Sequence, residues 1–181
     1  MKAVIQRVNG AKLSVEGKLI SEIANGLCVY FGVERGDDEA LLDYYAKKIS
    51  QMRIFEDENG KMNLSCLDKG YEILLISQFT LCANCSRGNR PDFFGAEEPT
   101  RAKDLYLKLG KKLEEKGIKV SYGVFGADML IEQGNCGPVT IILYNALVWR
   151  NTLKNKKTRR GAVRQYSNPS GFFFSFVFHP N

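Results

Sequence analysis

The clearest candidate for a nucleophile in this sequence lies in one segment. Ser77-Gln78-Phe79-Thr80-Leu81 ends an apolar run and contains two hydroxyl groups, of which Thr80 is the obvious nucleophile. No Lys, Asp or Glu directly flanks the segment to deprotonate Thr80, and the one histidine, His179, is the third residue from the end of the sequence. The sequence therefore disfavours Ser-His-Asp, Cys-His and polyhistidine zinc chemistry.

A second segment, Asn135-Cys136-Gly137-Pro138-Val139-Thr140, could form a rigid wall of backbone. X-Pro bonds are the ones where a cis form costs as little as roughly 0.5 to 1 kcal/mol, so a reversal that presents two carbonyls together is available there. Gly137 removes the Cβ. Such a wall would select a ligand by handedness and would be largely indifferent to its side chain. Alternatively, Gly137-Pro138 merely begins an edge strand, where proline is tolerated.

The five cysteines are odd in number and irregularly spaced, so a disulfide framework is unexpected. Cys82 and Cys85 form a CxxC, which could be a redox pair or half of a zinc site completed by Cys66 and Cys136. A lone CxxC is a weak signal, and small buried or loop thiols are the more common interpretation. We predict no metal and no organic cofactor.

The net charge of +6 is concentrated at one end of the chain. Residues 1–145 hold 19 Lys and Arg against 20 Asp and Glu, a net of −1, whereas residues 146–181 hold 7 against none, a net of +7. We predict one domain over residues 1–145 and a basic, then aromatic, extension over 146–181 that is peripheral or disordered. Alternatively, the extension is a basic arm that binds RNA phosphates in a salt-dependent way.

Neither a signal peptide nor an apolar run of 18 residues is present in the sequence, so we expect a cytoplasmic protein with no membrane partner.

The elements that must position these segments alternate between strand and helix patterns. Apolar residues recur at helical spacing after Asp37 or Asp38, either of which could cap a helix, and again after Thr100 up to Gly117. Strand patterns fall at residues 2–8, 13–15 and 19–23 (a hairpin), 26–33, 71–79, 118–124, 128–132 and 139–144, with a turn at 59–60 and a long loop over 82–99. This order predicts an α/β fold with a mixed sheet and two amphipathic helices packed on one side.

Together with three further segments, the two motifs resemble the D-aminoacyl-tRNA deacylase (D-tyrosyl-tRNA(Tyr) deacylase) family over residues 1–145. The further segments are Gln6-Arg7-Val8, Lys61-Met62-Asn63-Leu64 and Gly88-Asn89-Arg90-Pro91-Asp92-Phe93. The resemblance implies an obligate homodimer with barrel-like layers of mixed sheet. It also implies an enzyme that hydrolyses the ester between a D-amino acid and the terminal adenosine of tRNA.

The resemblance also implies roles for individual residues. Ser77, Gln78, Phe79 and Thr80 would surround the aminoacyl group, together with Met129. Gly137 and Pro138, joined by a cis bond, would enter the partner subunit's pocket and exclude an L side chain, with Arg7 holding them in place. The 2′-hydroxyl of the tRNA would help to activate water, and backbone N–H groups around Phe79 and Thr80 would receive the oxyanion. Cys136 departs from the family, in which an aspartate usually precedes the Gly-Pro pair.

Two other functions stay open at this point. The first is a non-catalytic tRNA- or RNA-binding homologue that keeps the fold. The second is a related deacylase with the proline in trans, which would admit L-alanine. The resemblance also allows removal of glycine mischarged on tRNA.

Overall fold

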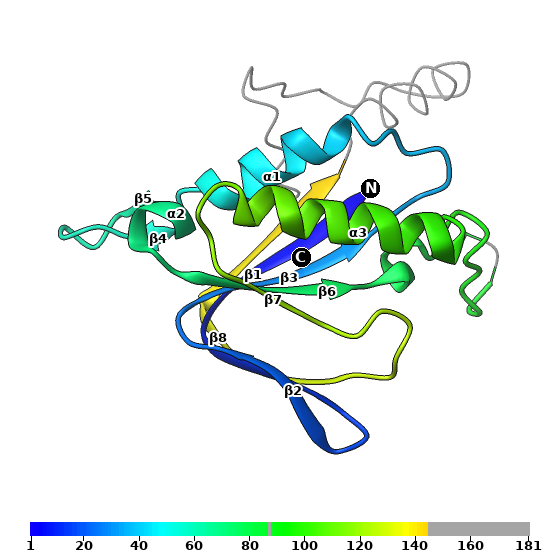
Figure 1. Cartoon of the computed structure of the whole chain (residues 1–181), viewed down its shortest axis with the longest axis horizontal. Coiled ribbons are helices and arrows are strands. Elements are labelled where there is room, and N and C mark those ends of the chain that lie inside the picture. Colours follow the sequence, from blue (N-terminus) through cyan, green and yellow to red (C-terminus); the bar gives the residue numbers. More distant parts are fainter. Residues whose placement is uncertain (87, 145–181) are drawn as a thin grey trace, which may run out of the picture. The chain divides into compact units, whose positions relative to one another are not determined.

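The computed structural model describes residues 1–86 and 88–144, which contain eight β-strands, three α-helices and one 3-10 helix. Figure 1 shows their arrangement. The extension predicted over residues 146–181 lies outside the described residues, so the division of the chain at residue 145 stays a prediction. Within the described ranges, no helix is both long and apolar enough to cross a membrane.

The long first strand organises the sheet. β1 (Lys2–Val15) pairs antiparallel with β3 (Gly26–Gly32) over its first half and with β2 (Lys18–Ile23) over its second half. β8 (Leu130–Tyr144) runs antiparallel along the other edge of β1. The predicted hairpin is confirmed, because β1 and β2 are joined by two residues that both adopt positive φ, as a tight hairpin turn requires.

Two parallel strands extend the sheet and allow it to close. β6 (Glu72–Ser77) pairs with β3, and β7 (Val120–Tyr122) pairs with β6, so the strand order is β2-β1-β3-β6-β7 with β8 on β1. The Ser21 hydroxyl of β2 donates a hydrogen bond to the Tyr122 carbonyl of β7 at 2.6 Å. The sheet therefore curls until β2 meets β7. The predicted mixed sheet with barrel-like layers is confirmed.

The two central strands are buried almost throughout. In β6, Ile73, Leu74, Leu75 and Ile76 are each 0% exposed, and β3 is similarly covered. Continuous apolar runs of this kind are typical of parallel strands with both faces covered, as the sequence predicts for residues 26–33 and 71–79. Burial of each such side chain contributes about 1.5 to 3 kcal/mol. The end of β6 is therefore firmly placed.

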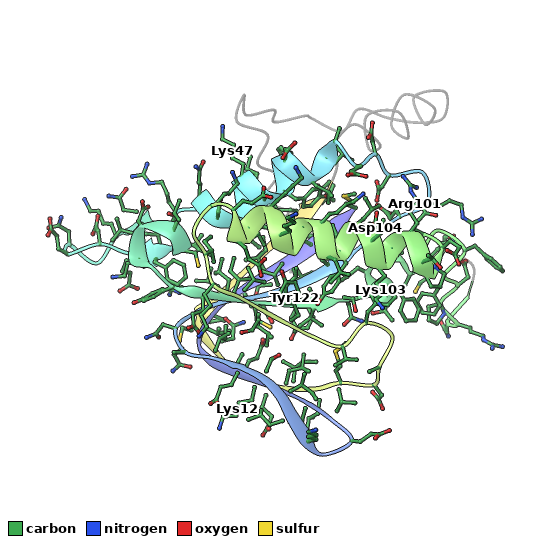
Figure 2. The ribbon with its side chains drawn as sticks, viewed as in Figure 1. Lys12, Lys47, Arg101, Lys103, Asp104 and Tyr122 are labelled. Atoms are coloured by element: carbon green, nitrogen blue, oxygen red, sulfur yellow. The ribbon has the colours of Figure 1, made fainter. Side chains whose placement is uncertain are left out.

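The predicted amphipathic helices are α1 (Leu41–Gln51) and α3 (Pro99–Glu114), which lie side by side on one side of the sheet (Figure 1). One ion pair joins α3 to α1, Lys112–Asp43 at 2.7 Å, and another joins α3 to the turn before α1, Lys108–Glu39 at 2.8 Å. Tyr122 of β7 lies beneath α3 (Figure 2), with its ring 6.1 Å from the ring of Tyr106 in an edge-to-face contact.

The predicted capping of α1 by Asp37 or Asp38 is wrong. The helix begins at Leu41 with Ala40 as N-cap and no side-chain cap, because both aspartates have other partners. Asp37 is buried and accepts hydrogen bonds from the N-terminal ammonium and, at 2.7 Å, from the Glu34 N–H. Asp38 accepts from the Ala40 N–H in a tight turn before the helix.

Two further differences separate the structure from the sequence pattern. The described residues contain a third helix, α2 (Cys66–Lys69), whose capping box consists of Ser65 and Asp68. It follows a small hairpin of β4 (Phe55–Glu56) and β5 (Met62–Leu64). The two strands predicted over 128–132 and 139–144 are one strand, β8, interrupted by a bulge.

Candidate active site

The segment Ser77–Thr80 is placed by the main chain. Ser77 ends β6 opposite Phe31, and the Gln78 N–H donates to the Phe31 carbonyl at 2.8 Å. The chain then enters the 3-10 helix η1 (Phe79–Cys82). A Cβ on Gly32 would lie 2.7 Å from the Gln78 carbonyl oxygen, so only glycine lets η1 approach the end of β3 so closely.

Phe79 and Thr80 are both exposed at the start of η1. Phe79 is 60% exposed, and its ring makes an edge-to-face contact with Phe93 at 5.1 Å. The first hydrogen bond of the turn runs from the Leu81 N–H to the Gln78 carbonyl at 3.3 Å. The N–H groups of Phe79 and Thr80 precede that bond, and such N–H groups have no partner within the helix.

The hydroxyl of Thr80 lies next to an amide rather than a base. Among the described residues, the side-chain hydrogen bond found for Thr80 Oγ1 is the one it accepts from Gln78 Nε2. An amide nitrogen cannot remove a proton from a hydroxyl. The surroundings of Thr80 therefore do not equip it as a nucleophile.

The CxxC does not form a reactive pair. Cys82 is buried and donates to the Val33 carbonyl at 3.4 Å, whereas Cys85 is exposed. Burial raises the pKa of the Cys82 thiol to about 11, so it stays protonated at neutral pH and is a poor nucleophile. Within the described part of the chain, no three His, Cys, Asp or Glu side chains gather where they could hold a metal.

The Gly-Pro pair lies in a bulge within β8 rather than at the start of a strand. The alternative interpretation, that Gly137-Pro138 begins an edge strand, is therefore wrong. Gln6 faces Thr140 and Val8 faces Asn135, so residues 136–139 lie opposite the single residue Arg7. We call residues 136–139 the β8 bulge.

The backbone of the β8 bulge requires glycine before proline. The Gly137–Pro138 bond is cis, as the resemblance implies. Gly137 has a φ of 120°, which L side chains rarely adopt, and a Cβ there would lie 2.8 Å from Val139 Cγ2 and 3.0 Å from Arg7 Nη2. Gly137 and Pro138 are both exposed. The Gly-Pro pair is thus at the surface of the described chain.

Arg7 holds one end of the β8 bulge. Its Nε donates to the Cys136 carbonyl at 3.2 Å and its Nη1 donates to the Ile54 carbonyl at 2.7 Å, while Nη2 lies 3.8 Å from a Glu56 carboxylate oxygen. The side chain is 13% exposed. The planar fork thus ties the bulge to the segment that leads into β4.

Met129 packs inside the curled sheet, apart from the β8 bulge. It is half-buried against the core cluster that includes Leu13 and Ile76, and a Cβ on Gly123 would lie 2.9 Å from its sulfur. It also lines a hollow of about 270 Å³ at the tip of the β1–β2 hairpin, formed with Ser14, Glu16, Gly17, Asp128 and Leu130. Neither motif belongs to that lining.

The two motifs do not meet within one chain. Ser77 pairs with Phe31, and Phe31 pairs with Ala3 of β1. The β8 bulge lies opposite Arg7 of β1. Along the strand direction, the two motifs are therefore separated by the distance from Ala3 to Arg7. Those four residues of strand span roughly 13 Å, and the three inter-strand spacings from β6 through β3 and β1 to β8 add a separation of roughly 14 Å across the sheet. In Figure 1, β6 ends at the right of the sheet, while β8 bends at the left.

Comparisons with known proteins place the chain among relatives. A family model described as D-Tyr-tRNA(Tyr) deacylase matches residues 4–144. This chain belongs to that family. The resemblance inferred from the five sequence segments is thus confirmed.

Two deacylases illustrate the degree of similarity. The D-aminoacyl-tRNA deacylase of Aquifex aeolicus is 51% identical over 143 residues, which cover 79% of this chain and 97% of the relative. That of Clostridioides difficile is 48% identical over 143 residues and is covered to 96%. The similarity spans nearly the whole of each relative.

Solved structures support the same fold. A protein named c-Myc DNA Unwinding Element Binding Protein superimposes with a TM-score of 0.75 at 41% identity, covering 80% of this chain and 99% of that one. A probable eukaryotic D-amino acid tRNA deacylase gives a TM-score of 0.68 at 16% identity, covering 78% and 97%. At that identity the second likeness shows the fold alone, a mixed α/β fold with a nearly closed sheet and three helices.

Asn135 begins the Gly-Pro motif, but sequence reasoning gave it no role of its own. It lies at the base of the β8 bulge and hydrogen bonds to two residues beyond it. The signal was present, because asparagine shortly before a Gly-Pro pair often bonds to the backbone of a turn.

Proposed function

We propose that this chain hydrolyses the ester between a D-amino acid and the 3′-terminal adenosine of tRNA, giving free D-amino acid and tRNA. The observation that carries the proposal is the family match over residues 4–144. The segments Ser77–Thr80 and Gly137–Pro138, on which the chemistry would depend, both lie inside the matched range. Hydrolysis frees the tRNA for correct charging. This removal of D-amino acids is chiral proofreading in translation. Because aminoacyl-tRNA is used where translation occurs, the proposed location is the cytoplasm.

The active site is proposed to form between two copies of the chain. Ser77–Thr80 and the β8 bulge lie far apart in one chain, and both Gly137 and Pro138 are exposed. In a homodimer, the bulge of each subunit would enter the pocket that its partner forms with Ser77–Thr80 and Met129.

Backbone carbonyls at the bulge would provide the chiral selection. A wall of carbonyl oxygens on one side of the α-carbon excludes a side chain of L configuration, and it makes no demand on the identity of a D side chain. The absence of a Cβ at Gly137 is required for this wall, because any larger residue would clash with Val139 and Arg7.

The tRNA itself is proposed to supply the activating group. Thr80 has an amide rather than a base beside its hydroxyl. The ribose 2′-hydroxyl next to the ester would instead activate water, and the N–H groups of Phe79 and Thr80 would stabilise the oxyanion. One such donor is typically worth about 3 kcal/mol of barrier, or roughly a hundredfold in rate.

A second candidate function is nucleic-acid binding without turnover. The structural neighbour at 41% identity is named for binding a DNA element, and residues 146–181 of this chain carry a net charge of +7. A third is a deacylase that admits L-alanine, against which the Ser77–Thr80 motif argues. Removal of glycine from tRNA is a compatible further activity.

Parallel time courses with D-tyrosyl-tRNA and L-tyrosyl-tRNA, with the full chain at sub-stoichiometric concentration, test the proposal. We expect cleavage of the D ester alone. Cleavage of an L ester would support the L-alanine deacylase. Salt-dependent tRNA binding with neither ester cleaved would overturn the proposed activity in favour of a binding protein.

A further inference from the structure

The β8 bulge must hold its shape without the hydrogen-bond ladder of the sheet. Residues 136–139 lie opposite Arg7 alone, so most of their backbone groups have no partner on β1. Backbone N–H and C=O groups away from water require other partners. Arg7 supplies one at the first residue of the bulge, where its Nε donates to the Cys136 carbonyl at 3.2 Å.

Asn135 supplies the partner at the last residue of the bulge. Its Oδ1 accepts a hydrogen bond from the Val139 N–H at 3.2 Å, and its Nδ2 donates to Thr140 Oγ1 at 3.3 Å. One side-chain amide therefore joins the residue before the bulge to its last residue and to the residue after it. The base of the bulge is closed by these two bonds.

Further side chains connect this amide to the core. Thr140 Oγ1 also accepts from Gln6 Nε2 at 3.2 Å, and Gln133 Nε2 donates to Gln6 Oε1. Gln133 Oε1 in turn accepts from the Tyr30 hydroxyl at 3.3 Å. Tyr30 packs against the core cluster inside the sheet. A continuous chain of side-chain hydrogen bonds thus runs from the core to the bulge.

We infer that Asn135 is a positioning residue for chiral selection, which acts by fixing Val139 and so the direction of the Gly137 and Pro138 carbonyls. Arg7 and Asn135 hold opposite ends of the β8 bulge. With one end released, the bulge can pivot about the other, and the wall that excludes L side chains loses its position. This inference rests on the proposed deacylase activity, because selectivity is its readout.

The decisive variants separate the two bonds of the amide. Asn135→Ala removes both of them. Asn135→Asp keeps an oxygen that accepts from Val139 but loses the donor to Thr140. Thr140→Val removes the Asn135–Thr140 bond together with the bond from Gln6, and leaves the bond to Val139 in place. Glu132→Ala is the matched control, because Glu132 is an exposed residue of the same strand outside the bulge.

The readout is the ratio of kcat/KM for D-tyrosyl-tRNA to that for L-tyrosyl-tRNA. Loss of the bond to Val139 should lower this ratio by about tenfold in Asn135→Ala, since an unpaired amide costs about 1.4 kcal/mol or more. Asn135→Asp and Thr140→Val should lower it less, and Glu132→Ala should leave it unchanged. A merely structural residue would change the rates on both esters alike and leave this ratio unchanged.

Hydrogen exchange of the Val139 amide, followed by NMR, gives a second measurement that does not depend on activity. We expect protection in the wild-type chain and in Asn135→Asp, and faster exchange in Asn135→Ala. An unchanged selectivity ratio in Asn135→Ala, or a Val139 amide that exchanges equally fast in the wild type, would overturn the inference. If Asn135→Ala does not fold, the aspartate and Thr140→Val variants carry the same comparison. A wild-type chain that cleaves neither ester would refute the proposed function, whereas the amide measurement would still test Asn135.

Discussion

The two halves of the candidate site are held in place by different means. Ser77–Thr80 follows directly from β6, whose residues 73–76 are fully buried and whose residues 73–75 are paired on both edges. The β8 bulge lies on an exposed strand edge and is held by two side chains, Arg7 and Asn135. Ser77–Thr80 should therefore lose its position only when the protein unfolds. A single substitution can displace the β8 bulge while the protein stays folded.

The same contrast separates chemistry from selection. The groups proposed to stabilise the reaction are backbone N–H groups at the start of η1, which side-chain mutagenesis cannot remove. The groups proposed to select the D configuration also belong to the backbone, because they are carbonyls. Their orientation, however, depends on hydrogen bonds from side chains. We therefore expect substitutions near the bulge to change the selectivity for D over L more than the rate of the chemical step.

The largest effect is expected from a change in the RNA rather than in the protein. A D-tyrosyl-tRNA that ends in 2′-deoxyadenosine lacks the hydroxyl proposed to activate water. Positioned acid-base groups contribute about 10² to 10⁴ in rate, so hydrolysis should slow by that factor. Single-turnover rates with the two substrates measure it. A normal rate on the deoxy substrate, paired with an inactive Thr80→Ala, would move the activating group back to the protein.

A core substitution should weaken the first half without changing selection. Leu74 of β6 is 0% exposed within the core cluster, so Leu74→Ala should lower the free energy of unfolding by about 2 to 5 kcal/mol. Urea denaturation measures this loss. Because β3 and β1 lie between Leu74 of β6 and the β8 bulge in the sheet, the ratio of D to L hydrolysis of the folded fraction should stay as in the wild type. A large fall in that ratio would show that the two halves are not independent.

Arg7→Lys should have the opposite effect to Leu74→Ala, a large change in the D-to-L ratio and a small change in the free energy of unfolding. A lysine ammonium cannot reproduce the planar fork that reaches both the Cys136 and the Ile54 carbonyls. Loss of a charge-assisted hydrogen bond costs about 1.5 to 3 kcal/mol, so the D-to-L ratio should fall by roughly 10- to 100-fold. The free energy of unfolding should change less than in Leu74→Ala. An unchanged ratio would mean that Arg7 serves the fold only.

The sequence predicted the first half of the site better than the second, for a physical reason. Burial and strand periodicity are local properties of a chain, so the run over residues 71–79 indicated its strand directly. The position of the Gly-Pro pair inside one long strand depends on the register between β1 and β8, which are more than a hundred residues apart in sequence. No local pattern encodes that register.

The same reason accounts for the misassigned cap. The neighbours in sequence predict Asp37 or Asp38 as the helix cap, but Asp37 is bonded to the N-terminal ammonium, 36 residues away, and Asp38 closes a turn before the helix. By contrast, the capping box of Ser65 and Asp68 was readable from its local spacing. The family resemblance supplied what local patterns could not, since it identified Arg7 and the Gly-Pro pair as parts of one site.

Thr80→Ala, a substitution in the Ser77–Thr80 half of the site, should have a small effect on the rate of hydrolysis. The hydroxyl accepts a hydrogen bond from Gln78 and is exposed, and the N–H group proposed to act in catalysis is retained in alanine. Loss of one exposed hydrogen bond costs about 1 kcal/mol at most, so kcat/KM for D-tyrosyl-tRNA should fall by about fivefold or less. A loss of more than a thousandfold would indicate that Thr80 is the nucleophile.

The smallest effect is expected from Cys136→Asp, which introduces the aspartate that the family resemblance implies before the Gly-Pro pair. The Cys136 sulfur makes one weak contact, to the Gly134 carbonyl at 3.7 Å. The carbonyl of the same residue is held by Arg7, and the far end of the β8 bulge is held by Asn135. Because the backbone has these partners without a carboxylate, we expect the D-to-L ratio of Cys136→Asp to stay within about threefold of the wild type, less than one net hydrogen bond. A rise of tenfold or more in the ratio would show that the two side chains leave the bulge partly free, and that a carboxylate at position 136 provides a third point of attachment.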